Sequence, residues 1–242
     1  MQIRLILLDF DGTLADTRRA NTLAYVATLR EAGYALTEEE YAAKYFGMRC
    51  DEFLTHFGIA DPAERERLRL RKIALYPAFF DTVRLNRPLW EFCRQFRAQG
   101  GRVWIVSTGS RANIDNAMHH LGISVAGRRS RETAPAEAVG KGTGKACTGT
   151  ADASITGSDA AGWDAAIPDT ATKPAPDEGP NGAVDGILSG ADVAHSKPAP
   201  DCFLEAMRRE GCTPRETLIF EDSEIGLEAA RRSGAGYFKV TL

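Results

Sequence analysis

The sequence predicts an α/β fold, a Rossmann-like parallel sheet core with an inserted α-helical cap domain. Two observations predict the core. Short apolar segments alternate with amphipathic helical segments along much of the chain, as in parallel sheets. Acidic or hydroxyl residues follow several of these apolar segments, at the sheet edge where α/β proteins bind ligands. A long helical stretch between the first two strands predicts the cap.

Composition narrows the class of protein. The chain has 242 residues, of which 43% are hydrophobic and 26% charged, as expected for a globular protein. A net charge of −3 gives no electrostatic reason to expect nucleic acid or an anionic membrane as partner. No apolar run approaches the roughly 20 residues of a membrane span. The five cysteines are scattered, which favours free thiols in a reduced cytoplasm. Nothing in the sequence predicts the oligomeric state.

The first predicted strand covers the apolar run from residue 3 to residue 8, and two carboxylates follow it. Asp9 and Asp11 stand two residues apart, and Gly12 predicts that the backbone leaves the extended conformation there. Carboxylates at the end of a buried strand are costly unless they bind a metal or react. The alternative is an ordinary Asp-Gly turn.

Helical patterns fill the chain from residue 17 to residue 86. A capping box beginning at Thr37 and the Asp61-Pro62 pair mark two helix starts. We therefore predict a catalytic core made of 1–16 and 87–242 and a cap at 17–86, although an all-helical half of one core is an alternative. The predicted helices of this part of the chain are 18–32, 38–45, 51–57, 62–76 and 88–99.

The second strand is predicted at 102–107. It ends in Ser107 and Thr108, and Gly109 and a helix follow. A hydroxyl group and backbone N–H groups at such a position can bind an anion. The same residues also serve as ordinary helix N-caps, so this pattern alone leaves both interpretations open.

Residues 127–186 are predicted to be a low-complexity, largely disordered insertion, because they contain too few large apolar residues to form a core. Within it, Lys173-Pro174 repeats the later Lys197-Pro198. An amphipathic helix follows Lys197 but not Lys173, which favours Lys197 as the functional copy. The sheet needs another strand before Lys197, and residues 183–188 are the candidate.

Order is predicted to return at residue 187. Glu221 and Asp222 stand at the end of the third predicted strand. Glu221 either caps the following helix or supports a metal site. The predicted elements here are a helix at 200–210, a strand at 217–220, a helix at 224–233 and a strand at 237–242.

Four motifs in this order resemble those of the haloacid dehalogenase superfamily. They are DFDGT at 9–13, a strand ending in Ser107, Lys197 before a proline, and the acidic pair Glu221-Asp222. The closest similarity is to the β-phosphoglucomutase and sugar-phosphatase branch, whose helical cap is inserted at the same place. The resemblance covers both ends of the chain and leaves out the insertion.

The resemblance implies a Mg²⁺-dependent phosphoric monoester hydrolase acting through an aspartyl-phosphate. Asp9 would be the nucleophile and Asp11 the general acid and base. Mg²⁺ would be bound by Asp9, Asp11 through its carbonyl group, and Asp222, with Glu221 in support. The phosphoryl group would contact Ser107, Thr108 and Lys197. The implied partner is a small phosphorylated metabolite, a sugar or sugar-acid phosphate.

Two alternatives remain. A phosphomutase of the β-phosphoglucomutase type would carry a histidine where this chain has Asn21, and an arginine one residue later than Arg49. Arg49, with Lys44, is nevertheless the cap candidate for contacting an acidic substrate, and a solvated face of the cap is the alternative. The second alternative is a catalytically impaired or non-enzymatic relative, damaged by the insertion. An acid at position 11 disfavours dehalogenation in this family.

Overall fold

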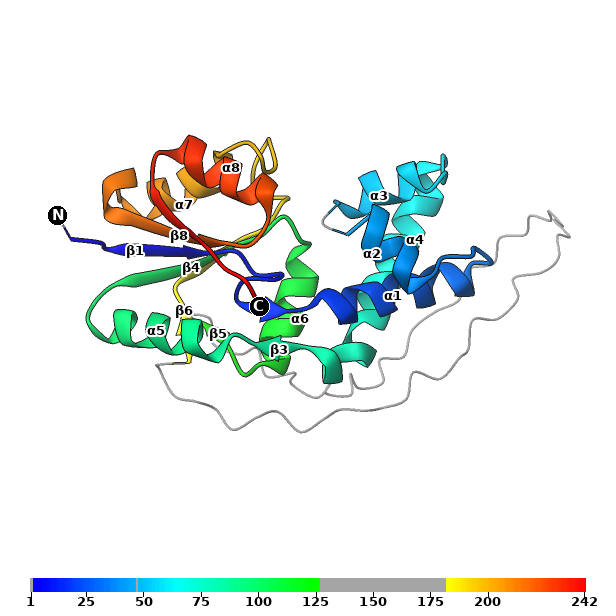
Figure 1. The fold of residues 1–242 in the computed structure, drawn as a ribbon, viewed down its shortest axis with the longest axis horizontal. Coiled ribbons are helices and arrows are strands. Elements are labelled where there is room, and N and C mark those ends of the chain that lie inside the picture. Colours follow the sequence, from blue (N-terminus) through cyan, green and yellow to red (C-terminus); the bar gives the residue numbers. More distant parts are fainter. Residues whose placement is uncertain (1, 47, 127–181) are drawn as a thin grey trace, which may run out of the picture. The chain divides into compact units, whose positions relative to one another are not determined.

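The computed structural model describes residues 2–46, 48–126 and 182–242. Its main sheet has five strands, all paired in parallel, in the order β7-β4-β1-β8-β9 (Figure 1). The predicted parallel-sheet α/β fold is therefore confirmed. The strands are β1 (Leu5–Leu8), β4 (Arg102–Val106), β7 (Gly186–Leu188), β8 (Thr217–Glu221) and β9 (Gly236–Lys239).

The central strand β1 is buried on both faces, which explains its uninterrupted apolar sequence. Leu5 and Leu7 pack with α7 (Asp201–Glu210) and α8 (Glu224–Ser233), whereas Ile6 and Leu8 pack with α5 (Arg87–Ala98) and α6 (Arg111–His120). Figure 1 shows α7 and α8 on one side of the sheet and α5 on the other. Helices thus cover both faces.

A second group of helices lies between two short strands. β2 (Ala15–Asp16) pairs antiparallel with β3 (Arg84–Leu85), so the chain leaves and re-enters the sheet region at neighbouring points. These helices have a hydrophobic core of their own, which includes Tyr25, Leu29 and Phe53. The packing supports the cap predicted at 17–86, and the division into two domains stays a prediction. The elements are α1 (Arg18–Glu31), α2 (Glu38–Lys44), α3 (Cys50–His56), α4 (Pro62–Leu75) and the 3₁₀ helix η1 (Tyr76–Thr82).

The predicted strand at 183–188 forms, but in two parts. β6 (Ala183–Val184) pairs with β5 (Ser124–Val125) in a small separate sheet, and β7 joins the main sheet beside β4. Residues 182–186 were expected at the end of the disordered insertion and instead belong to the fold. Residues 127–181, including Lys173, lie outside the described residues.

Asp185 explains why this end of the predicted insertion is ordered. Its side chain is 1% exposed and pairs with Arg97 Nε at 2.9 Å and with Arg102 Nη1 at 3.0 Å. One carboxylate oxygen also accepts the backbone N–H of Val103 at 2.8 Å. The prediction of disorder rested on the small number of large apolar residues, and such a count does not detect a segment that is held by charged hydrogen bonds.

The last strand is shorter than the predicted 237–242, since β9 ends at Lys239. Val240 donates its N–H to the carbonyl group of Glu221. Because Glu221 is the final residue of β8, this strand has no further residue with which β9 could pair. The predicted helices agree with the observed ones within about two residues at each end. A 3₁₀ helix, η2 (Pro214–Glu216), precedes β8 and was not predicted.

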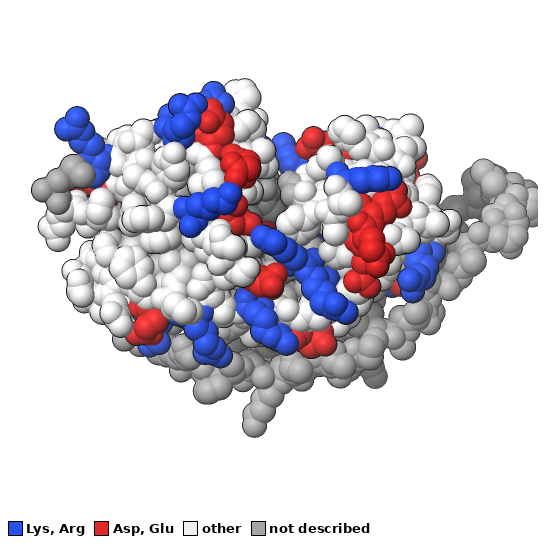
Figure 2. Space-filling view, in the orientation of Figure 1, with Lys and Arg blue, Asp and Glu red and all other residues white. Residues whose placement is uncertain are grey.

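The surface carries charges of both signs. On the face drawn in Figure 2, basic and acidic side chains lie interleaved. Along α4, for example, Glu64 pairs with Arg67 and Glu66 with Arg69 at helical spacing. Among the described residues, no helix is both long and apolar enough to cross a membrane.

Candidate active site

The loop after β1 places two carboxylates at the carboxyl end of the sheet. Asp9 continues the strand for one residue, with its N–H bonded to the carbonyl group of Phe220 on β8. The chain then turns at Gly12, whose φ of +91° favours glycine. A Cβ atom on Gly12 would lie 2.3 Å from Asp222 Oδ2, so this turn also makes room for Asp222. The break predicted at Gly12 is confirmed.

Lys197 joins the ends of three strands, β1, β4 and β8. Its Nζ atom lies 2.6 Å from Asp9 Oδ1 and 2.6 Å from Glu221 Oε1, and it donates to the carbonyl group of Val106 at 3.1 Å. The side chains of Lys197, Asp9 and Glu221 are almost completely buried. A buried cation between two buried carboxylates offsets the cost of desolvating all three groups.

Glu221 is bonded to the start of the following helix, which is one of the two roles that the sequence left open, and its support of a metal stays a prediction. One oxygen contacts Lys197, and the other accepts the backbone N–H and the hydroxyl group of Ser223 at 2.8 and 3.0 Å. Ser223 is the N-cap of α8, so Glu221 fixes the start of this helix as well as the position of Lys197. Glu221 can lie this close to α8 because residue 226 is glycine, since a Cβ atom at that position would lie 1.8 Å from Glu221 Oε1.

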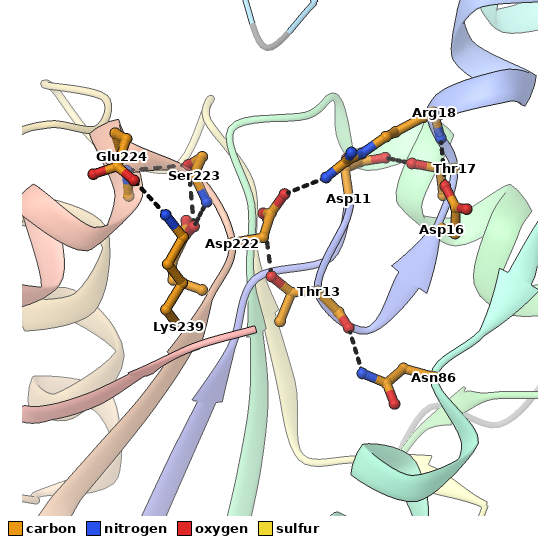
Figure 3. Close-up of polar contacts among 12 residues, drawn as sticks. Asp11, Thr13, Asp16, Thr17, Arg18, Asn86, Asp222, Ser223, Glu224 and Lys239 are labelled. Carbon is orange, nitrogen blue, oxygen red and sulfur yellow. Dashed lines mark hydrogen bonds and ion pairs between the residues drawn. The ribbon is translucent and has the colours of Figure 1, made fainter. Parts of the chain in front are cut away.

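Asp9, Glu221 and Asp222 form an acidic cluster. One ligand atom from each lies within 4.8 Å of the others. Asp222 Oδ1 accepts the hydroxyl group of Thr13 at 3.2 Å, and Arg18 Nη2 lies 3.3 Å from Asp222 Oδ2 (Figure 3). Carboxylate oxygens held this close fit a hard divalent cation such as Mg²⁺.

Charge within the cluster supports that fit. Burial raises the pKa of Asp9 well above its ordinary value; Lys197 opposes this rise, and Glu221 adds to it. Burial and Glu221 also raise the pKa of Asp222. Burial alone would lower the pKa of Lys197, but Asp9 and Glu221 raise it above the ordinary lysine value. The cluster therefore has more carboxylates than nearby cations, and a bound cation would keep them ionised.

Asp11 points to a different set of partners from Asp9. Its Oδ1 accepts the hydroxyl group of Thr17 at 2.5 Å and the side-chain N–H of Asn21 at 3.2 Å. A Cβ atom on Gly109 would lie 3.4 Å from Asp11 Oδ2 and 3.2 Å from Ser107 Oγ. The second oxygen of Asp11 therefore faces the loop after β4, and α1 holds the first.

Lys72 stands behind Asn21 and was not predicted from the sequence. It is buried, donates to Asn21 Oδ1 at 2.7 Å, and lies 4.0 Å from the ring centre of Tyr76. Burial lowers the pKa of Lys72 to about 8, against the opposing effect of Asp11. Lys72 belongs to α4, whose many arginines and glutamates are typical of an exposed helix. The sequence pattern therefore did not predict that Lys72 is buried.

The loop after β4 contributes the hydroxyl groups predicted to bind an anion. Ser107 is buried, its N–H bonds to Leu188 of β7, and its Oγ accepts the N–H of Gly109 at 3.0 Å. Ser110, rather than Ser107 or Thr108, is the N-cap of α6. Neither Ser107 nor Thr108 is therefore the N-cap of α6, and the N-cap interpretation left open by the sequence does not apply to them.

Two cavities meet at these residues and share Asp11, Phe46 and Thr108. The smaller, of about 80 Å³, is also lined by Asp9, Ser107, Lys197, Glu221 and Asp222. The larger, of about 360 Å³, is lined by Asn21 and by three basic residues, Arg49, Arg69 and Lys72. Lys44 pairs with Glu40 on the surface and is not among the lining residues.

Family models agree with this arrangement. A model described as haloacid dehalogenase-like hydrolase matches residues 6–171, and a second with the same description matches residues 178–240. The first covers more than half of the chain, so the predicted superfamily resemblance is confirmed.

Curated relatives match over shorter stretches. Fructose-1-phosphate phosphatase YqaB of Escherichia coli is 40% identical over 58 residues, which are 24% of this chain and 31% of that protein. Protein CbbY of Rhodobacter capsulatus is 44% identical over 71 residues, 29% of each chain. The chain thus spans less than a third of the length of these two relatives.

Solved structures show the same fold. A crystal structure of CbbY from Rhodobacter sphaeroides in complex with phosphate has a TM-score of 0.68 at 18% identity, covering 100% of this chain and 87% of that one. β-Phosphoglucomutase from Clostridium difficile has a TM-score of 0.62 at 15% identity, covering 100% and 86%. With the motif residues gathered at one edge of a sheet of this type, the chain belongs to the haloacid dehalogenase-like hydrolase family.

Proposed function

We propose that the protein is a Mg²⁺-dependent phosphatase that hydrolyses a small sugar or sugar-acid phosphate through an aspartyl-phosphate. The observation that carries this proposal is the position of Lys197 between Asp9 and Glu221, beside Asp222 and facing Asp11 across a small cavity. This cavity combines a nucleophile, a second acid, a buried cation and hard oxygen ligands.

Asp9 is the nucleophile in this proposal. A carboxylate oxygen of Asp9 forms a bond to phosphorus, and the bond between phosphorus and the ester oxygen breaks. Lys197 holds Asp9 Oδ1 in place and supplies positive charge close to the incoming phosphoryl group. Ser107 and Thr108 line the same cavity and bind phosphoryl oxygens.

Asp11 moves the protons. Because Thr17 and Asn21 hold one of its oxygens, the other is available to protonate the leaving alcohol. The resulting Asp11 carboxylate then takes a proton from water, which attacks the phosphorus atom and releases inorganic phosphate. Asp9 is regenerated at the end of this step.

Asp9, Asp222 and the Asp11 carbonyl group would bind Mg²⁺, with Glu221 in support. When bound, Mg²⁺ reduces the repulsion between the Asp9 carboxylate and the anionic phosphate.

The larger cavity favours a small anionic substrate. Its volume of about 360 Å³ suits a metabolite, and its basic lining residues Arg49, Arg69 and Lys72 favour negative charge beyond the transferred phosphoryl group. Relatives named as a fructose-1-phosphate phosphatase and as a phosphorylated carbohydrates phosphatase of Thermotoga maritima support a sugar phosphate.

Hydrolysis is favoured over the two alternatives. A mutase resembling β-phosphoglucomutase would have a titratable histidine beside Asp11, whereas here the amide of Asn21 occupies that place. The impaired relative was expected if the strand before Lys197 failed to form, but β7 is paired with β4 and Lys197 lies in the site.

Phosphate release from an aryl phosphate tests the proposal, with Mg²⁺ or with EDTA. We expect turnover that requires Mg²⁺ and is abolished in Asp9→Asn, while Asp81→Asn, at an exposed carboxylate on η1, retains it. Labelling by a ³²P-phosphate ester in the wild type that hydroxylamine removes, and that is absent in Asp9→Asn, would identify the acylphosphate. Equal turnover by both variants would contradict the role of Asp9.

A further inference from the structure

Arg18 makes a contact that the proposed mechanism does not use. It is the first residue of α1, and its Nη2 atom lies 3.3 Å from Asp222 Oδ2. Asp222 is almost buried, with a side chain 10% exposed, whereas the Arg18 side chain is 54% exposed. An exposed cation from the helical region thus contacts one carboxylate of the acidic cluster, as Figure 3 shows for Arg18 and Asp222.

The two oxygens of Asp222 have different partners. Oδ1 accepts the hydroxyl group of Thr13, a neutral donor from the loop after β1, and Oδ2 contacts the guanidinium group. Oδ2 is also the atom that lies closest to the Cβ position of Gly12, a residue of the loop that bears Asp9 and Asp11. Burial and Glu221 raise the pKa of Asp222, and the guanidinium group on this oxygen opposes that rise and partly neutralises the cluster.

We propose that Arg18 is a built-in competitor of the divalent cation: it pairs with Asp222 in the metal-free protein and is displaced when the metal binds. This inference rests on the proposed function. A carboxylate oxygen that binds a metal loses much of its attraction for a guanidinium group beside it, because two cations then repel each other. Metal binding and the Arg18–Asp222 pair therefore weaken each other by the same factor.

The position of Arg18 gives this competition a consequence for the helical region. Arg18 immediately follows Thr17, which bonds to Asp11, and its guanidinium group lies 5.6 Å from the ring centre of Phe46. Phe46 lines both cavities. In the metal-free protein the pair ties the start of α1 to the end of β8. In the metal-bound protein this tie is released, and the guanidinium group is free beside the cavity that receives the phosphate.

Calorimetric titration with Mg²⁺ alone tests the proposal without any turnover. We expect Arg18→Gln to lower the Kd for Mg²⁺ by about two- to fivefold, the range of an exposed ion pair. Arg19→Gln removes the same charge from the next, also exposed, residue and should leave the Kd near that of the wild type. Arg18→Lys keeps a cation and should give a Kd between those of the wild type and Arg18→Gln.

Ionic strength provides a second measurement. The ratio of wild-type to Arg18→Gln Kd should decrease towards one between about 0.05 M and 1 M NaCl, because salt screens an exposed pair. An unchanged or higher Kd in Arg18→Gln, or an equal decrease in Arg19→Gln, would overturn the competition. If the folded wild type bound no Mg²⁺, the proposed function itself would fail. Equal binding by the wild type and Arg18→Gln would refute this inference alone.

Discussion

Lys197 Nζ lies 2.6 Å from Asp9 Oδ1, although the two residues are 188 positions apart in the sequence. The contact joins the loop after β1 to the segment before α7, and Glu221 at the end of β8 completes it from a third part of the chain. Lys197 thus links the ends of neighbouring strands and also holds the proposed nucleophile Asp9 in place.

Replacing Lys197 with methionine should therefore reduce both stability and activity. The variant leaves two buried carboxylates without a cation, which should lower the free energy of unfolding by about 3–5 kcal/mol. Phosphate release should fall by about 100-fold or more, since charge opposite the phosphoryl group is lost. Urea unfolding and a phosphate assay measure the two effects. Lys239→Met, which removes an exposed lysine paired with Glu224, is the control, and similar behaviour of both variants would contradict the prediction.

Gly226 provides a test of Glu221 that leaves every charged group in place. A Cβ atom at this position would lie 1.8 Å from Glu221 Oε1, so Gly226→Ala should push the carboxylate away from Lys197 and Ser223. We expect the affinity for Mg²⁺, measured by calorimetry, to fall by about 10- to 100-fold, as for other supporting groups of metal sites. Gly236→Ala, where the new Cβ would make an ordinary 3.4 Å contact, should bind Mg²⁺ like the wild type. Wild-type affinity in Gly226→Ala would show that Glu221 does not support the metal.

The parallel sheet and the gathering of motif residues at one of its edges could be predicted from the sequence, whereas the order of the strands was not. Apolar runs such as that of β1 identify buried parallel strands, and parallel strands bring their carboxyl ends to the same edge. The sequence therefore predicts that Asp9 and Glu221 lie near each other. The family resemblance placed Lys197 at the same site as a phosphoryl contact, and its bonds to Asp9 and Glu221 were not predicted.

The surroundings of Asp11 could not be predicted in the same way. Lys72 is a lysine in a highly charged helix, and only the packing of α4 against α1 buries it beside Asn21. Asp185 likewise stands at the end of a stretch with few apolar residues, and its partners Arg97 and Arg102 are more than 80 positions away. Periodicity detects apolar faces, whereas these anchors are polar contacts between distant segments.

Lys72 should make stability depend on pH in a particular direction. Because its pKa is lowered to about 8, the unfolded chain binds more protons than the folded chain between about pH 8 and 10.5. The free energy of unfolding therefore rises with pH through this window. From pH 7 to pH 10, the wild type should gain roughly 2–3 kcal/mol relative to Lys72→Met in urea unfolding. Lys44→Met, at an exposed lysine on α2, should show no such gain. A difference between the wild type and Lys72→Met that stays constant with pH would contradict a lowered pKa of the buried Lys72.

Asp185 should contribute stability that is lost in acid. Burial alone would raise its pKa, but Arg97, the N–H of Val103 and Arg102 together lower it. The stabilisation is therefore complete above the unfolded pKa of about 3.9 and disappears as the pH falls through the lower, folded value. Asp185→Asn should lower the free energy of unfolding by about 3 kcal/mol at pH 7 and at pH 5, and by less below about pH 4. Asp81→Asn should change it little at any pH, since that carboxylate is exposed. Thermal unfolding across this range measures both variants, and a small effect of Asp185→Asn at pH 7 would mean that contacts other than Asp185 hold β7 beside β4.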